Sequence, residues 1–127
     1  MAPIHKPLDR STTFETMLSI SPALGPVVLL NIISLHPGVD KKSFLKTWSH
    51  TADVLKKAPG DISTQLHSAI GDGNFIVNYA VWENNEDLKN GLALPEFRKI
   101  CEEFPEGTGF RACVLQKVSI PRVCVGL

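Results

Sequence analysis

Residues 26–36 read PVVLLNIISLH, an apolar run rich in β-branched side chains that ends before Pro37-Gly38. This composition predicts a β-strand over about 27–36. Alternate residues of a strand point to opposite faces, and here both faces are apolar, so both have to be covered. The amide of Asn31 lies in the middle of the run, and burying it unpaired costs about 1–3 kcal/mol. Asn31 therefore needs partners or a function.

The composition is that of one ordinary globular domain. The chain has 127 residues, with 13 basic and 13 acidic side chains and no net charge. Without a basic stripe we expect no nucleic-acid partner, and no apolar run approaches the roughly 20 residues that span a membrane. Residues 1–25 also lack the apolar core of a signal peptide. The three cysteines have no metal-ligand spacing, so we expect reduced thiols in a cytoplasmic protein and no metal site.

The two ends of the chain are expected to lie outside the main domain, which we place at residues 26–120. Residues 1–25 contain three prolines, and we interpret them as an arm rather than a strand. Within the arm, Thr12–Glu15 resembles a capping box and predicts a short helix that lies on the domain or on a partner subunit. Residues 121–127 begin with Pro121 and are expected to form a tail.

Strand-like and helix-like patterns alternate in the rest of the chain. Asp40 is expected to cap a helix that ends at Ala58-Pro59-Gly60, and residues 71–74 read as a tight turn. The expected elements are a helix over 41–57, strands over 61–70 and 75–83, a helix capped by Asn84 or Asn85, a helix starting at Pro95 and a strand over 109–119.

The order β-α-β-β-α-β defines a ferredoxin-like α+β unit. In such a unit the helices cover one face of the sheet, whereas the strands over 27–36 and 75–83 are apolar on both faces. A second, identical sheet is the cheapest cover for the remaining face, so the sequence predicts a homodimer.

Several segments in this order resemble the antibiotic biosynthesis monooxygenase domain of the dimeric α+β barrel superfamily, over about residues 26–119. The resemblance implies a dimeric barrel and, for small members, a place in natural-product pathways. The superfamily also contains heme-degrading enzymes, polyketide cyclases, isomerases and decarboxylases. The matching segments are Val28–Asn31, Phe44 with Trp48, PGDISTQLH at 59–67, FIVNYAVWE at 75–83 and LPEF at 94–97.

The motif of the heme-degrading branch of the superfamily tests whether heme degradation is expected for this chain. This motif resembles an asparagine in the first strand, a tryptophan ending the third and a histidine four residues after the phenylalanine of the last helix. Asn31 and Trp82 match the first two, but the residue four after Phe97 is Cys101. Apolar surroundings are expected to keep Cys101 a thiol, so heme degradation is not expected.

The cofactor-independent monooxygenases that the chain resembles hydroxylate phenolic or anthrone-like substrates, whose anion hands an electron to oxygen. Such a site needs a dry pocket, donors for the enolate or phenolate oxygen and aromatic walls. The sequence has neither a glycine-rich phosphate loop nor metal-spaced ligands, so we expect no cofactor. A binding module would show the same absences.

Three residues are candidate catalytic groups. Asn31 would donate to a developing oxyanion, the alternative being a structural amide. Trp82, which ends its strand, would wall the pocket or take part in electron transfer, the alternative being plain core. His67 would act as the general base if its strand face looks toward the helices, the alternative being a half-exposed strand histidine.

Substrate contacts are expected from two helices. Trp48 and Phe44 share the apolar face of the helix over 41–57, and Phe97 and Cys101 share a face of the helix that starts at Pro95; plain core is the alternative for these side chains. The sequence does not decide whether three further residues line the site, namely His36, His50 and Arg111.

Three functions stay open at this stage. The first is a cofactor-free monooxygenase acting on a polyketide-like phenol or anthrone in a pocket between sheet and helices. The second is a non-redox cyclase, isomerase or dehydratase in which His67 is the acid or base and Asn31 holds an enolate. The third is a non-catalytic subunit of a pathway. A Ser-His-Asp hydrolase is poorly supported, because the chain has no G-x-S-x-G motif and the expected fold is a different one.

Overall fold

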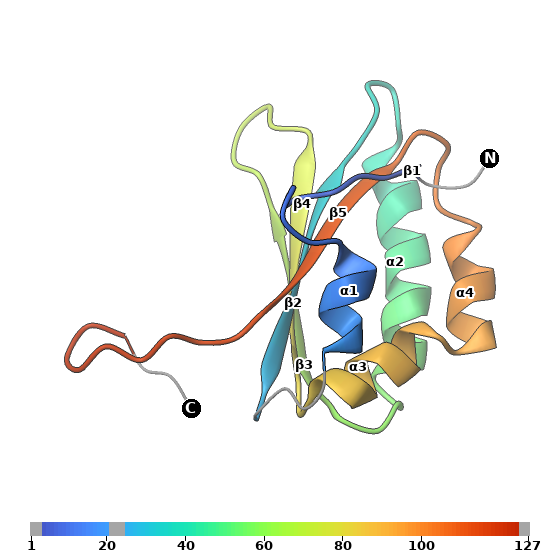
Figure 1. Cartoon of the computed structure of the whole chain (residues 1–127). Coiled ribbons are helices and arrows are strands. Elements are labelled where there is room, and N and C mark those ends of the chain that lie inside the picture. The colour runs from blue at the N-terminus through green and yellow to red at the C-terminus, as the bar shows by residue number, and fades with distance from the viewer. Residues whose placement is uncertain (1–3, 21–24, 125–127) are drawn as a thin grey trace.

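The computed structural model describes residues 4–20 and 25–124, and in these residues a five-stranded sheet has the order β1-β5-β2-β4-β3. Neighbouring strands are antiparallel except for β1 and β5. All four helices of the described residues lie on one face of the sheet (Figure 1). The elements are β1 (Ile4–His5), α1 (Phe14–Ser19), β2 (Val27–Ser34), α2 (Lys41–Leu55), β3 (Asp61–Ser68), β4 (Phe75–Trp82), α3 (Asn85–Leu92), α4 (Pro95–Cys101) and β5 (Gly109–Leu115).

The expected ferredoxin-like α+β fold is confirmed. From β2 to β5 the elements follow in the order β-α-β-β-α-β, with α3 and α4 together forming the second helical part. The central strand is β2, which pairs with β4 from Val27↔Trp82 to Ser34↔Phe75 and with β5 on its other side. This register places Asn31 between Asn78 of β4 and Ala112 of β5.

Helices α2 and α3 begin where a side chain accepts a hydrogen bond from one of their first amides. The carboxylate of Asp40 accepts from the Lys42 amide at 3.1 Å, and the side chain of Asn84 accepts from the Asp87 amide at 2.8 Å. Strand β5 ends at Leu115, earlier than the predicted residue 119. Its ladder on β2 stops at Val28↔Leu115 because β2 itself begins at Val27.

The N-terminal arm differs from the prediction in one respect, because it contains a strand. The amides of Ile4 and Lys6 donate to the carbonyls of Thr108 and Phe110 at 2.9 and 2.8 Å, so β1 extends the edge of the sheet. These are backbone bonds of a two-residue strand, which no side-chain pattern reveals. The expected short helix is present as α1, although its cap is Thr13, which accepts from the Thr16 amide at 3.1 Å.

Two buried clusters form the core between the sheet and the helices. One lies at the Val27 end of β2 and the other at its Ile33 end, so that Asn31 falls between them. On β4, Asn78 likewise separates Ala80 and Trp82 from Ile76. The first cluster contains Val27, Leu29, Ala80, Trp82 and Leu88; the second contains Ile33, Phe44, Ile76, Phe104 and Phe110.

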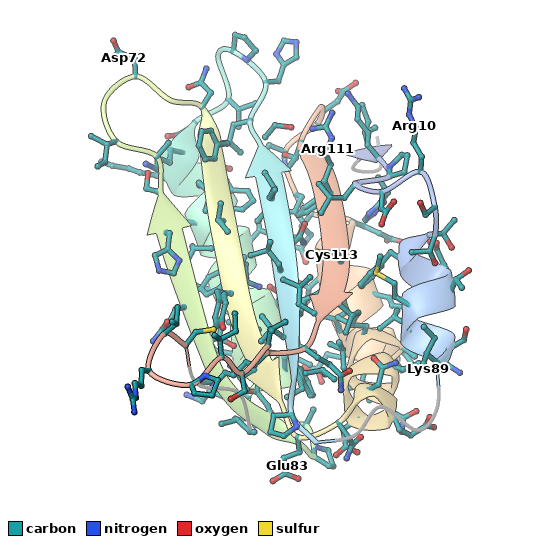
Figure 2. All side chains as sticks on the ribbon, turned by 60° about the vertical axis from the view of Figure 1, so that its left-hand side comes forward. Arg10, Asp72, Glu83, Lys89, Arg111 and Cys113 are labelled. Carbon is teal, nitrogen blue, oxygen red and sulfur yellow. The ribbon has the colours of Figure 1, made fainter. Side chains whose placement is uncertain are left out.

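The other face of the sheet, here called the open face, carries no described helix. Figure 2 looks onto it, with the helices behind the sheet and Arg111 and Cys113 labelled on β5. In Figure 1 the segment that follows β5 extends away from the sheet on this side, and its Val118 and Val123 are 69% and 76% exposed. The apolar side chains of β2 and β4 on the open face are Val28, Leu30, Ile32, Phe75, Val77, Tyr79 and Val81.

None of the helices in residues 4–20 and 25–124 combines the length and the apolarity needed to cross a membrane.

Phe44 is fully buried in the second cluster, where its ring stacks with Phe104 at 5.4 Å between centroids. Replacing Phe44 with Ala is expected to lower the free energy of unfolding by about 3–5 kcal/mol, because it removes a ring from a packed core. Urea unfolding followed by circular dichroism measures this. Ile70→Ala is the control, since Ile70 is 98% exposed and its loss is expected to cost under about 0.5 kcal/mol. Equal effects of the two substitutions would contradict the packing described.

Candidate active site

A cavity of about 550 Å³ lies between the helix-covered face of the sheet and the helices. Its volume is within the range of roughly 300–1,000 Å³ that is usual for small-molecule sites. Strands β2 and β4 form its floor, while α2, α3, α4 and the N-terminal arm supply the walls. It lies where Asn31 and Asn78 interrupt the core.

Asn31 and Asn78 are cross-strand partners and both line the cavity. Their Oδ1 atoms are buried and have no hydrogen-bond partner among the described residues. An amide presents an acceptor oxygen and two N–H donors, so the pair offers a ligand both functions at adjacent points. Because an unpaired buried polar atom costs about 1–3 kcal/mol, two neighbouring ones point to a partner from outside the protein.

Aromatic rings contribute to the walls of the cavity. The chain has two tryptophans, and both line the cavity, Trp82 from the end of β4 and Trp48 from α2. Phe97 and Phe104 add two more rings from the side of α4. Aromatic rings offer flat, apolar contact area, which suits a planar ring system.

Five of the seven residues predicted for the site come together in this cavity. Trp82 pairs with Val27, which lies four residues before Asn31 on β2. Asn31 and Trp82 therefore share the helix-covered face of the sheet. The other three are Trp48, Phe97 and Cys101.

Two predicted residues are not brought to the cavity. Phe44 is 0% exposed and packs in the core behind it, because Phe104 and the sheet cover its ring. His67 pairs with Val77 and therefore lies on the open face, where it is exposed. The condition under which His67 was predicted to act, a strand face turned toward the helices, is not met. His36, His50 and Arg111 are not among the lining residues either.

Sequence reasoning missed Asn78 and the contribution of the arm. Asn78 has the same strand parity as Trp82 in FIVNYAVWE, so the signal was present in the sequence. Four arm residues also line the cavity, and no local pattern reveals them, because tertiary contacts place them there. They are His5, Phe14, Glu15 and Leu18.

Charged groups enter the cavity lining from the helices. Lys89 of α3, Arg98 of α4 and Glu15 of α1 line it.

Burial raises the pKa of the Cys101 thiol to about 11, against an opposing effect of the nearby Arg98 charge. Cys101 therefore stays protonated near neutral pH, and since the metal-binding form of cysteine is the thiolate, it does not fit the role of a heme ligand. In the described part of the chain, no group of three or more His, Cys, Asp or Glu residues could hold a metal ion.

The fold and the site thus define a ferredoxin-like α+β protein whose cavity is lined by amides and aromatic rings and has the volume usual for a small-molecule site. The sequence profile of the antibiotic biosynthesis monooxygenase family matches residues 26–103, and the chain belongs to this family.

Comparison with individual proteins agrees with this membership. The chain is 28% identical to a tetracenomycin-F1 monooxygenase of Streptomyces glaucescens over 82 residues, which cover 65% of this chain and 72% of the relative. The crystal structure of SnoaB, a cofactor-independent oxygenase of Streptomyces nogalater, superposes with a TM-score of 0.70 at 19% identity, covering 77% of this chain and 98% of SnoaB. A Mycobacterium tuberculosis protein has the same fold, with a TM-score of 0.62 at 14% identity over 76% of this chain and 98% of its own.

Proposed function

We propose that the protein is a cofactor-independent monooxygenase of natural-product biosynthesis, acting on a phenolic or anthrone-like polyketide in the cavity between sheet and helices. The observation that carries this proposal is that the cross-strand amides Asn31 and Asn78, whose buried Oδ1 atoms have no partner among the described residues, both line a cavity that also contains Trp48 and Trp82. The relatives named as a tetracenomycin-F1 monooxygenase and as a cofactor-independent oxygenase support the choice of reaction class.

The proposed reaction requires the protein to stabilise the substrate anion and to keep water out of the cavity. When an anthrone loses a proton, negative charge develops on its oxygen, and the Nδ2 groups of Asn31 and Asn78 donate hydrogen bonds to that oxygen. Preorganised donors in a low-dielectric site stabilise such charge without having to reorganise. The rings of Trp48 and Trp82 hold the flat substrate over the amides.

The electron-rich anion then reacts with dioxygen. One oxygen atom becomes a new carbonyl oxygen on the methylene carbon of the anthrone. The other oxygen atom leaves as water with the two hydrogens of that methylene group. The carbon is oxidised and dioxygen is reduced, so the reaction balances without an outside reductant.

The non-redox alternative, a cyclase, isomerase or dehydratase, relied on His67 as its acid or base. His67 is exposed on the open face of the sheet and not among the cavity-lining residues, so no observation favours this alternative over the oxygenase.

We further propose that the protein acts as a homodimer in the reducing cytoplasm. The open face presents apolar side chains on adjacent strands, and a second sheet of the same kind would cover them. The segment after β5 extends on this same side, with exposed Val118 and Val123 ready to contact a partner subunit (Figure 1). Cys101, Cys113 and Cys124 are all free, as is usual for a protein in a reducing compartment.

Oxygen uptake with dithranol, a dihydroxyanthrone, tests the reaction. The protein is expected to consume oxygen and form the anthraquinone, and Asn31→Ala or Asn78→Ala is expected to lower kcat about 100-fold, because each removes an oxyanion donor. Asn90→Ala is the matched control, since Asn90 is exposed on α3 and does not line the cavity. An isomeric product formed under nitrogen would sink the oxygenase proposal, as would unchanged turnover in both amide variants.

Light scattering at micromolar concentration tests the dimer. The expected mass is twice the 13.9 kDa of one chain. Leu30→Lys places a charge in the middle of the open face and is expected to shift the mass toward one chain. Ile70→Lys, at a position that is 98% exposed, is expected to leave the mass unchanged. A mass of 13.9 kDa for the unaltered protein would contradict the proposal.

A further inference from the structure

The N-terminal arm lies outside the part of the chain that matches the family, yet it helps to build the cavity. The family match starts at residue 26, and the superposition with SnoaB covers nearly all of SnoaB but only 77% of this chain. From residues 4–20 come His5, Phe14, Glu15 and Leu18, all of which line the cavity. The arm thus reaches the site from outside the residues that match the family.

Helix α1 packs at the end of the cavity that contains Trp82. Phe14 and Leu18 contact the buried cluster that includes Trp82, whose side chain is only 1% exposed. Figure 1 shows α1 on the helix-covered side of the sheet, and the structure gives it contacts with both α3 and β5. The two apolar side chains of α1 thus shield this end of the cavity from water.

A single side chain of α3 holds the end of α1. The Nδ2 group of Asn85, which is 3% exposed, donates to the carbonyl oxygens of Met17, Leu18 and Ile20 at 2.8, 3.2 and 2.9 Å. Carbonyls at the end of a helix lack a partner in the regular helical pattern, and Asn85 supplies a donor to them. The Met17 carbonyl also accepts from the Ile20 amide at 3.3 Å. A second attachment comes from the Val114 amide, which donates to the Sδ atom of Met17 at 3.3 Å.

These attachments decide where α1 lies, because a helix of its length has little stability of its own. It spans Phe14–Ser19, far fewer than the roughly 12–15 residues at which isolated helices become even marginally stable. Its position is therefore set by Asn85, by Met17 and by the packing of Phe14 and Leu18.

We propose that residues 4–20 form a substrate-selecting wall of the cavity and that Asn85 is the positioning residue that holds this wall against Trp82. The proposal rests on the function proposed above for the nature of the substrate, a fused-ring phenol. The wall limits how far a ring system extends past Trp82, so Phe14 and Leu18 set the size of the rings accepted. Asn85 touches no substrate and acts through the arm.

Tryptophan fluorescence tests the role of Asn85 without any substrate. In a Trp48→Phe background the single remaining tryptophan is Trp82, which belongs to the buried cluster that Phe14 and Leu18 pack against. Asn85→Asp replaces the donor with an oxygen that faces three carbonyl oxygens, so α1 is expected to detach from α3. Quenching of Trp82 by acrylamide is then expected to rise several-fold. Asn90→Asp, on the exposed side of the same helix, is the matched control and is expected to leave the quenching unchanged.

Substrate selectivity tests the wall and does not depend on how the Asn85 variant folds. Leu18→Ala enlarges the cavity beside Trp82 and is expected to shift the ratio of kcat/KM about tenfold toward a four-ring naphthacenone over the three-ring dithranol. Most of this shift is expected in KM. Leu8→Ala is the control, because Leu8 belongs to the arm but does not line the cavity.

The outcomes separate this inference from the proposed function. If Asn85→Asp increases the quenching of Trp82 while the unaltered protein oxidises no anthrone, the proposed wall stands and the proposed oxygenase function is wrong. Normal oxygen uptake with the same ring-size preference in Leu18→Ala as in the unaltered protein would overturn the wall. Unchanged Trp82 quenching in a folded Asn85→Asp protein would overturn the role of Asn85.

Discussion

The structure depends on a polar interruption in an apolar sheet. Asn31 and Asn78 face each other across β2 and β4, with one buried cluster on each side of them along the strands. Aliphatic side chains at these two positions would join the clusters into one continuous core. The amides keep the clusters apart at a cost of about 1–3 kcal/mol for each unpaired oxygen, and the cavity occupies the space between them.

Much of the fold can be predicted from the sequence, because alternate residues of a strand point to opposite faces. The two apolar faces of PVVLLNIISLH indicate a central strand, and the caps at Asp40 and Asn84 mark two helix starts. The family resemblance, and not the periodicity, implies that Asn31 and Trp82 share one face, because the pairing of β2 with β4 decides this. The periodicity also does not say which face of β3 looks inward, because the turn between β3 and β4 sets that register. His67 lies on the open face for this reason.

How deeply a side chain is buried, and which residues far away in the sequence it contacts, are harder to predict than the face of the strand or helix on which it lies. Phe44 and Trp48 lie one turn apart on α2, yet Phe44 is fully buried against Phe104 and the sheet while Trp48 lines the cavity. The arm shows the same limit, because Asn85 binds backbone carbonyls that every residue type has. No sequence pattern predicts such contacts. The family-defining strands therefore place the amides, and a segment outside the family match completes the walls around them.

The most direct test of the central claim is a crystal structure with a dihydroxyanthraquinone bound, since this oxidised ring system does not react further. The account predicts the quinone between Trp48 and Trp82, with one of its oxygens within hydrogen-bond distance of the amides of both Asn31 and Asn78. A quinone bound on the open face, or one in the cavity that leaves both amides unpaired, would contradict it.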